Sequence, residues 1–109
     1  MQKGIAEKAK AARHSLRNES EGGPATIVNM KYVYLLQSIH YPHQRYIGIA
    51  DDVEARLAKH NEGGSIHTTK YKPWNLVAYF AFEDVAKAMS FERYLKSGSG
   101  RAFANKHLW

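Results

Sequence analysis

The stretch that decides the fold runs from residue 32 to residue 50 and reads YVYLLQSIHYPHQRYIGIA. Its first part, YVYLLQ, is mostly aromatic, β-branched or aliphatic, and its last part, RYIGIA, has the same character, which is typical of β-strands. The intervening SIHYPHQ contains the proline and polar residues of a loop. Because this connection is short, we expect strands at 32–37 and 45–50 to pair as an antiparallel hairpin.

A helix signal follows the hairpin directly. Asp51 can act as N-cap, and Glu54 stands three residues later, where an acidic capping box requires it. Val53 and Leu57 then form a narrow apolar face, and the glycine pair at 63–64 is predicted to end the helix.

The remaining elements are a strand and two helices. A polar loop containing Pro73 precedes a predicted strand at 75–83. Glu83 or Asp84 can cap a helix that runs to about Lys96, SGSG at 97–100 breaks it, and 101–108 is predicted as a short last helix. The order β-β-α-β-α-α predicts an α+β domain with a small three-stranded, mostly antiparallel sheet flanked by helices.

Residues 1–29 differ in composition from the rest of the chain. They include five basic and three acidic residues, no aromatic residue and a Glu-Gly-Gly-Pro break at 21–24. A segment with so little apolar surface to bury is typical of a flexible basic arm. We therefore expect an N-terminal extension at 1–29 and a folded domain at 30–109.

Composition limits the class of protein. The chain has 109 residues, enough for one domain, and a formal net charge of +6 that favours polyanionic partners. It has no cysteine, which excludes disulfides, thiolate metal sites and a cysteine nucleophile. No apolar run approaches the roughly 20 residues that span a bilayer. We expect a cytoplasmic protein with no membrane partner.

One acidic residue departs from the apolar pattern of its helix. Val85, Ala88, Met89 and Leu95 fall on one predicted stripe, and Glu92 lies in the centre of that stripe. A carboxylate on a buried face is costly unless it is paired or binds a cation. Two readings stay open: an ion pair with a basic residue, or a ligand for a hard cation such as Mg²⁺.

Basic and aromatic residues elsewhere allow similar alternatives. Arg56 and His60 are four residues apart on the first helix, so they form either a solvated basic face or a phosphate contact beside a proton-transfer group. Tyr34 and Tyr46 lie on the two hairpin strands, where core packing is the usual fate of tyrosine. Gly48, inside a strand, predicts close approach by another group.

Taken in register, these residues resemble the GIY-YIG nuclease superfamily. Tyr32-Val33-Tyr34 and Tyr46-Ile47-Gly48 are similar to its two naming motifs, with Tyr32 in place of glycine. The resemblance covers 30–109 and continues through DDVEARLAKHNEG, TKYKPWNLVAYFAF and FERYLKSGSGRAF. It is strongest to small single-domain bacterial members related to the N-terminal nuclease domain of the excision-repair subunit UvrC. Those enzymes carry a lysine where Ile49 stands and an asparagine at the place of Ala104, which Asn105 follows.

The resemblance implies a catalytic site. Glu92 would hold one divalent ion, Mg²⁺ or Mn²⁺, and Arg56 would stabilise charge on the phosphate. Tyr34 and Tyr46 would position the attacking water, with one of them as general base and His60 as the group that assists it. We expect these five side chains to converge on one shallow basic groove.

The resemblance also implies a nucleic-acid partner. Candidates for phosphate contacts are Lys59, Lys70, Lys72 and Arg101, whereas Trp74 either stacks on a base or closes the core. We expect a metal-dependent endonuclease that hydrolyses DNA phosphodiester bonds, with repair or recombination as its setting. The alternatives are a non-catalytic nucleic-acid-binding module on the same scaffold and a partner-recruiting domain.

Overall fold

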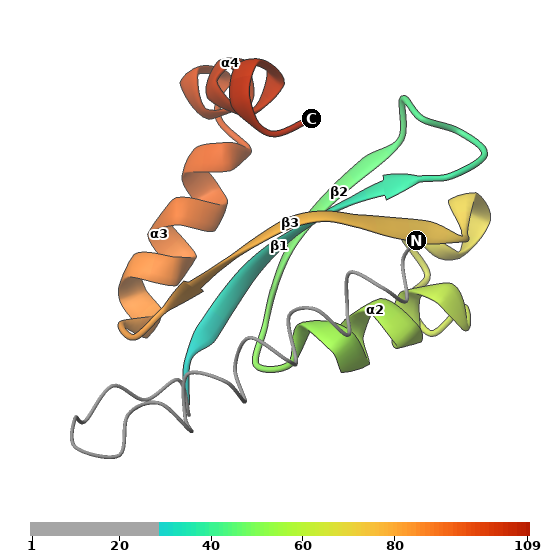
Figure 1. Cartoon of the computed structure of the whole chain (residues 1–109), viewed down its shortest axis with the longest axis horizontal. Coiled ribbons are helices and arrows are strands. Elements are labelled where there is room, and N and C mark those ends of the chain that lie inside the picture. Colours follow the sequence, from blue (N-terminus) through green and yellow to red (C-terminus); the bar gives the residue numbers. More distant parts are fainter. Residues whose placement is uncertain (1–28) are drawn as a thin grey trace, which may run out of the picture.

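A three-stranded antiparallel sheet forms the centre of the computed structural model, which describes residues 29–109 (Figure 1). Its strands are β1 (Lys31–Ser38), β2 (Arg45–Ala50) and β3 (Trp74–Phe82), arranged in the order β2-β1-β3. The predicted hairpin of β1 and β2 is confirmed, with Tyr34 opposite Gly48. The expected N-terminal extension lies, except for Asn29, outside the described residues.

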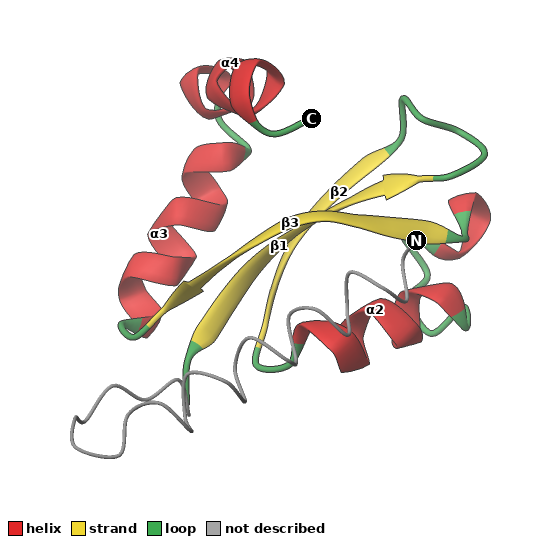
Figure 2. Cartoon of the chain, viewed as in Figure 1, coloured by secondary structure: helices red, strands yellow, loops and turns green. Residues whose placement is uncertain are grey.

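Helices cover both faces of the sheet (Figure 2). They are α2 (Val53–Asn61) on one side, and α3 (Val85–Leu95) and α4 (Gly98–His107) on the other, with a short 3₁₀ helix η1 (Thr69–Tyr71) in the predicted loop. The predicted α+β class and β-β-α-β-α-α order are confirmed. Among the described residues, no helix has the length and apolar character needed to span a membrane.

The pleat of β1 divides the core into two clusters. Tyr32, Tyr34 and Leu36 pack on the α2 side, together with Val53 and Leu57 of that helix. On the opposite side, two other β1 residues join residues of α3 and α4; the buried members of this cluster are Val33, Leu35, Ala88, Leu95 and Ala104. The central strand is therefore buried on both faces, and each fully buried side chain of this size contributes roughly 1.5–3 kcal/mol.

The start of α2 differs from the prediction by one residue. Asp52, not Asp51, is the N-cap, and its carboxylate accepts a hydrogen bond from the backbone N–H of Ala55 at 3.1 Å. Asp51 instead accepts from Nζ of Lys31 at 2.7 Å, across the sheet end. The predicted capping box with Glu54 is wrong because Glu54 is then one position too early. The predicted helix end is confirmed, since Gly63 follows the C-cap with a φ of 82°.

The last helix, α4, begins at Gly98, three residues earlier than predicted. Ser97 caps α4 by accepting from the N–H of Gly100 at 3.3 Å, so the SGSG segment starts the last helix as well as ending α3. A Cβ at Gly100 would collide with the backbone carbonyl of Tyr94. Glycine at this position therefore allows the two helices to meet in a tight corner.

Candidate active site

Gly48 on β2 leaves space that a side chain of the neighbouring strand β1 fills. A Cβ at this position would lie 2.5 Å from Oη of Tyr34, so the phenol occupies the space that any other residue would fill. Tyr34 itself is fully buried. The prediction that Gly48 marks a close approach is confirmed, and the group that approaches is the Tyr34 hydroxyl.

A chain of hydrogen bonds starts at that hydroxyl. Oη of Tyr34 lies 2.9 Å from Nε2 of His60, and Nδ1 of His60 lies 2.7 Å from Oγ1 of Thr68. His60 is only 2% exposed, so its interpretation as part of a solvated basic face is wrong. The imidazole sits inside the α2-side core because both of its nitrogens find a hydroxyl partner there.

Tyr46 extends this cluster towards solvent. Its ring centroid is 4.9 Å from that of His60 and 6.1 Å from that of Tyr34. Unlike Tyr34, Tyr46 is only partly buried and lines an open groove. The two tyrosines therefore have different access to anything bound in the groove.

Burial and nearby charges keep Tyr34 and His60 neutral. Burial raises the pKa of Tyr34 well above its ordinary value, and Tyr46 raises it further by charge, whereas Arg56 lowers it by charge and by a hydrogen bond. Burial lowers the pKa of His60, and the cations Arg56 and Lys59 lower it more. At neutral pH the site holds a protonated phenol beside an uncharged imidazole.

Glu92 lies on the side of α3 that faces the sheet, but the predicted stripe around it is wrong in part. Val85 and Met89 are 48% and 47% exposed, while Ala88 and Leu95 are buried. The reason is that Phe91 contacts the rings of two β3 phenylalanines and thereby rotates α3. Glu92 remains three residues from Leu95 and four from Ala88, on the buried face.

The Glu92 carboxylate is ion-paired with the ammonium group of Lys96, one helical turn later. The side chain of Glu92 is 17% exposed and that of Lys96 is 53% exposed, so the pair is open to solvent. Within residues 29–109, no group of three or more His, Cys, Asp or Glu side chains is placed to hold a metal ion. A single carboxylate fits Mg²⁺ or Mn²⁺ only as an ion that keeps most of its water ligands.

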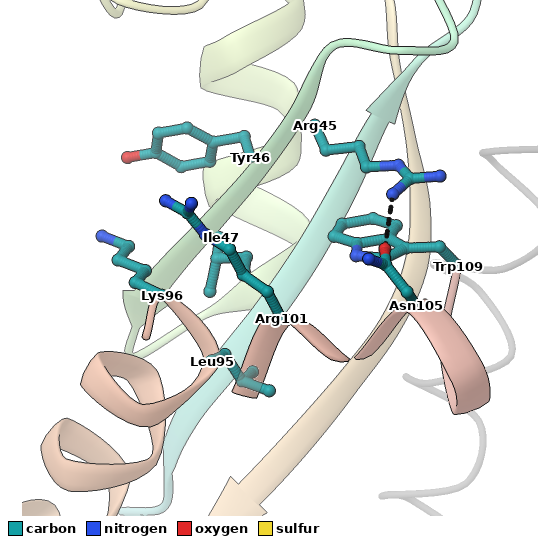
Figure 3. Close-up of a pocket in the computed structure, with 8 residues that line it drawn as sticks. All are labelled: Arg45, Tyr46, Ile47, Leu95, Lys96, Arg101, Asn105 and Trp109. Carbon is teal, nitrogen blue, oxygen red and sulfur yellow. Dashed lines mark hydrogen bonds between the residues drawn. The ribbon is translucent and has the colours of Figure 1, made fainter. Parts of the chain in front are cut away.

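A groove of about 400 Å³ lies between β2 and the end of α3 and α4. Figure 3 shows Tyr46, Lys96 and Arg101 on one side of it and Arg45, Asn105 and Trp109 on the other. Nη1 of Arg45 donates to Oδ1 of Asn105 at 3.0 Å, and its guanidinium lies 4.8 Å from the centroid of the Trp109 ring. The groove carries three cationic side chains and no lining acid.

The structure brings the predicted site residues together only in part. Tyr34, Tyr46, His60 and Arg56 form one cluster, whereas Glu92 approaches the groove through Lys96 from the other face of the sheet. Among the predicted phosphate contacts, Arg101 lines the groove, and three others are exposed outside its lining: Lys59, Lys70 and Lys72. Trp74 is 2% exposed, so it closes the core and is not a stacking surface.

Four contributors were missed from the sequence. Thr68 follows no pattern that links it to His60, because the contact is made by a loop. Arg45 and Trp109 belong to the groove only because β2 and the chain end meet in space. Lys96 could have been found, since a basic residue four positions after Glu92 on a helix is a standard pairing distance.

Comparison with known proteins agrees with this geometry. Residues 30–106 match the family model described as the GIY-YIG catalytic domain. The chain belongs to the GIY-YIG family. The proposed resemblance is thereby confirmed, and family membership supports a nuclease.

Two relatives illustrate the range of GIY-YIG proteins that this chain resembles. The structure-specific endonuclease subunit SLX1 of Candida dubliniensis is 34% identical over 83 residues, which cover 70% of this chain and 28% of the relative. A UPF0213 protein of Streptococcus pyogenes serotype M3 is 33% identical over 72 residues, which cover 65% of this chain and 76% of the relative. The chain therefore spans little more than a quarter of the SLX1 relative but most of the small bacterial one.

Proposed function

We propose that this GIY-YIG chain is a divalent-metal-dependent endonuclease that hydrolyses DNA phosphodiester bonds, in DNA repair or recombination. The observation that carries the proposal is the buried hydrogen bond between Tyr34 and His60, placed beside Tyr46 and Arg56. A neutral phenol and imidazole in this arrangement can stabilise a phenolate at the neighbouring Tyr46. The printed name of the SLX1 relative, a structure-specific endonuclease subunit, supports the same reaction class.

Tyr46 is the tyrosine that meets the substrate. It lines the groove, whereas Tyr34 is fully buried and has no access to water there. Tyr46 first loses its own proton to solvent in the groove. As a phenolate it then takes a proton from the attacking water, whose oxygen bonds to phosphorus as the ester P–O bond breaks, and the leaving oxygen takes a proton from solvent. Arg56, held near the Tyr34 hydroxyl, stabilises the charge that develops on the phosphate oxygens.

Glu92 is the residue that would hold the divalent ion. Its carboxylate reaches solvent, and its partner Lys96 is exposed and can swing away at little cost. An ion held there would supply Lewis acidity at the scissile phosphate and would stabilise the leaving oxygen. The ion pair with Lys96 neutralises the partly buried charge of the Glu92 carboxylate.

DNA fits the groove by charge. Arg45 and Arg101 lie on opposite sides of it, so a phosphodiester strand laid along the groove passes between two guanidinium groups. Guanidinium groups bind phosphate oxygens in a bidentate way. The exposed lysines at positions 59, 70 and 72 add positive charge elsewhere on the described surface.

The test is a plasmid-nicking assay with Mg²⁺ or Mn²⁺, comparing the unaltered chain with Glu92→Gln. We expect the substitution to reduce the rate by about 10²-fold or more, because it removes the only carboxylate assigned to the ion. Glu83→Gln is the matched control, since Glu83 is exposed at the start of α3 and should cut at the original rate. Salt-dependent DNA binding without nicking by the unaltered chain would support the non-catalytic binding module instead.

A further inference from the structure

Thr68 is a buried polar residue that takes part in none of the proposed reaction steps. It is 1% exposed and follows the end of α2. Its carbonyl accepts from the indole Nε1–H of Trp74 at 2.9 Å, and its Oγ1 lies 2.7 Å from Nδ1 of His60. A core tryptophan therefore holds the backbone of Thr68, and the hydroxyl of Thr68 is directed at the imidazole.

The neutral imidazole of His60 has one N–H, so its two hydroxyl partners determine where that hydrogen lies. If Nδ1 carried it, the hydrogen would point at Thr68, and the Thr68 hydroxyl hydrogen would have no acceptor among the hydrogen bonds of residues 29–109. If Nε2 carries it, Thr68 donates to Nδ1 and His60 donates to Tyr34. Each arrangement leaves one hydroxyl hydrogen over: that of Thr68 in the first, and that of Tyr34 in the second. The second is favoured because an unused buried donor is costly, and the Tyr34 hydroxyl lies beside the Tyr46 side chain whereas Thr68 is enclosed in the core.

Hydrogen-bond donors and acceptors can be counted in the same way at the Tyr34 hydroxyl. Nε2–H of His60 donates to the phenolic oxygen at 2.9 Å, and the nearby Arg56 has donors only, so neither group can accept the phenolic hydrogen. The phenolic hydrogen is then left to point towards Tyr46, whose ring centroid is 6.1 Å from that of Tyr34. Burial keeps the pKa of Tyr34 high, so this hydrogen is retained.

We propose that Thr68 is a positioning residue that fixes the tautomer of His60, so that a directed chain of donors runs from Thr68 through His60 and Tyr34 to the oxygen of Tyr46. This inference rests on the proposed nuclease function. A donor aimed at the Tyr46 oxygen stabilises the phenolate that accepts the proton from water. Thr68 never touches substrate and acts entirely through His60 and Tyr34.

The experiment compares Thr68→Val, which keeps the shape and removes the hydroxyl, with Thr68→Ser, which restores a hydroxyl. The nicking rate is measured from pH 6 to pH 10. We expect Thr68→Val to cut about tenfold more slowly at pH 7, with the rising limb of its pH profile moved up by about one unit and recovery at high pH. Thr68→Ser should follow the unaltered profile. A profile of unchanged shape in Thr68→Val overturns the inference.

A second measurement does not depend on cleavage. Nitrogen-15 NMR of the imidazoles reports which nitrogen of His60 is protonated, and we expect Nε2–H in the unaltered chain and mixed tautomers in Thr68→Val. Observation of Nδ1–H in the unaltered chain overturns the assignment, even if the protein cuts DNA. Conversely, Nε2–H in a protein that cuts no DNA leaves the tautomer correct and removes the nuclease proposal.

Discussion

Gly48→Ala tests the site through one added methyl group. The new Cβ would lie 2.5 Å from Oη, 2.6 Å from Cζ and 2.9 Å from Cε1 of Tyr34. Carbon atoms in favourable contact are about 3.5–4.0 Å apart, so the phenol has to retreat by roughly 1 Å. The ring is fully buried and has nowhere to go without disturbing its neighbours. Overpacking of this kind costs about 1–3 kcal/mol.

The displacement also breaks function, because Oη leaves its 2.9 Å hydrogen bond to His60. A shift of this size at a catalytic group reduces rates by about 10²-fold. Urea denaturation measures the stability, and plasmid nicking measures the rate. Gly98→Ala is the control, since its Cβ meets nothing within 4 Å and alanine favours a helix, so stability should be equal or slightly higher. If the free energy of unfolding of Gly48→Ala is within about 0.5 kcal/mol of that of the unaltered chain, the steric reasoning is wrong.

Three further predictions concern charge. Because the pKa of His60 is lowered in the folded chain, the unfolded chain binds a proton at a higher pH than the folded chain does. The free energy of unfolding should therefore decrease as pH falls below about 6.5, by up to about 1.4 kcal/mol per pH unit. Urea denaturation at several pH values should show a smaller decrease in His60→Gln, and an equal decrease in both proteins would contradict this. Lys96→Met frees the Glu92 carboxylate, so half-maximal nicking should need several-fold less Mn²⁺; an unchanged requirement would show that the ion pair does not compete with the metal. Arg101→Ala should reduce the slope of log Kd against log salt for duplex DNA by about 0.9, whereas Lys87→Ala, on exposed α3 surface, should leave it unchanged; equal slopes for both variants would place Arg101 outside the contact.

The element order could be predicted because strands and helices leave local patterns. Strand boundaries came within a residue or two, since turn residues frame the aromatic and β-branched runs. The choice between Asp51 and Asp52 as N-cap could not be made locally, because both are carboxylates and the answer depends on which one reaches Lys31 across the sheet. The buried side of α3 likewise depends on where Phe91 meets β3.

The site residues could be predicted from the sequence, but several of their contacts could not. Tyr34, Tyr46, Arg56, His60 and Glu92 could be named because their spacing resembles a family pattern, and their individual roles remain proposals. The link between His60 and Thr68 has no signature in sequence, because the path of the loop between them sets it. The contact of Arg45 with Asn105 joins residues 60 positions apart and exists only in the folded chain.

The alternation of side chains along β1 makes the domain modular. Tyr34 and His60 belong to the α2 side, whereas Glu92 and part of the groove belong to α3 and α4, and the two apolar clusters share no member. An engineer could therefore exchange the last helix for one with a different charge pattern, and so change the charge of the groove, without repacking the residues around His60. Redesign of the histidine environment is less independent, because Tyr46 contacts the His60 ring and also lines the groove.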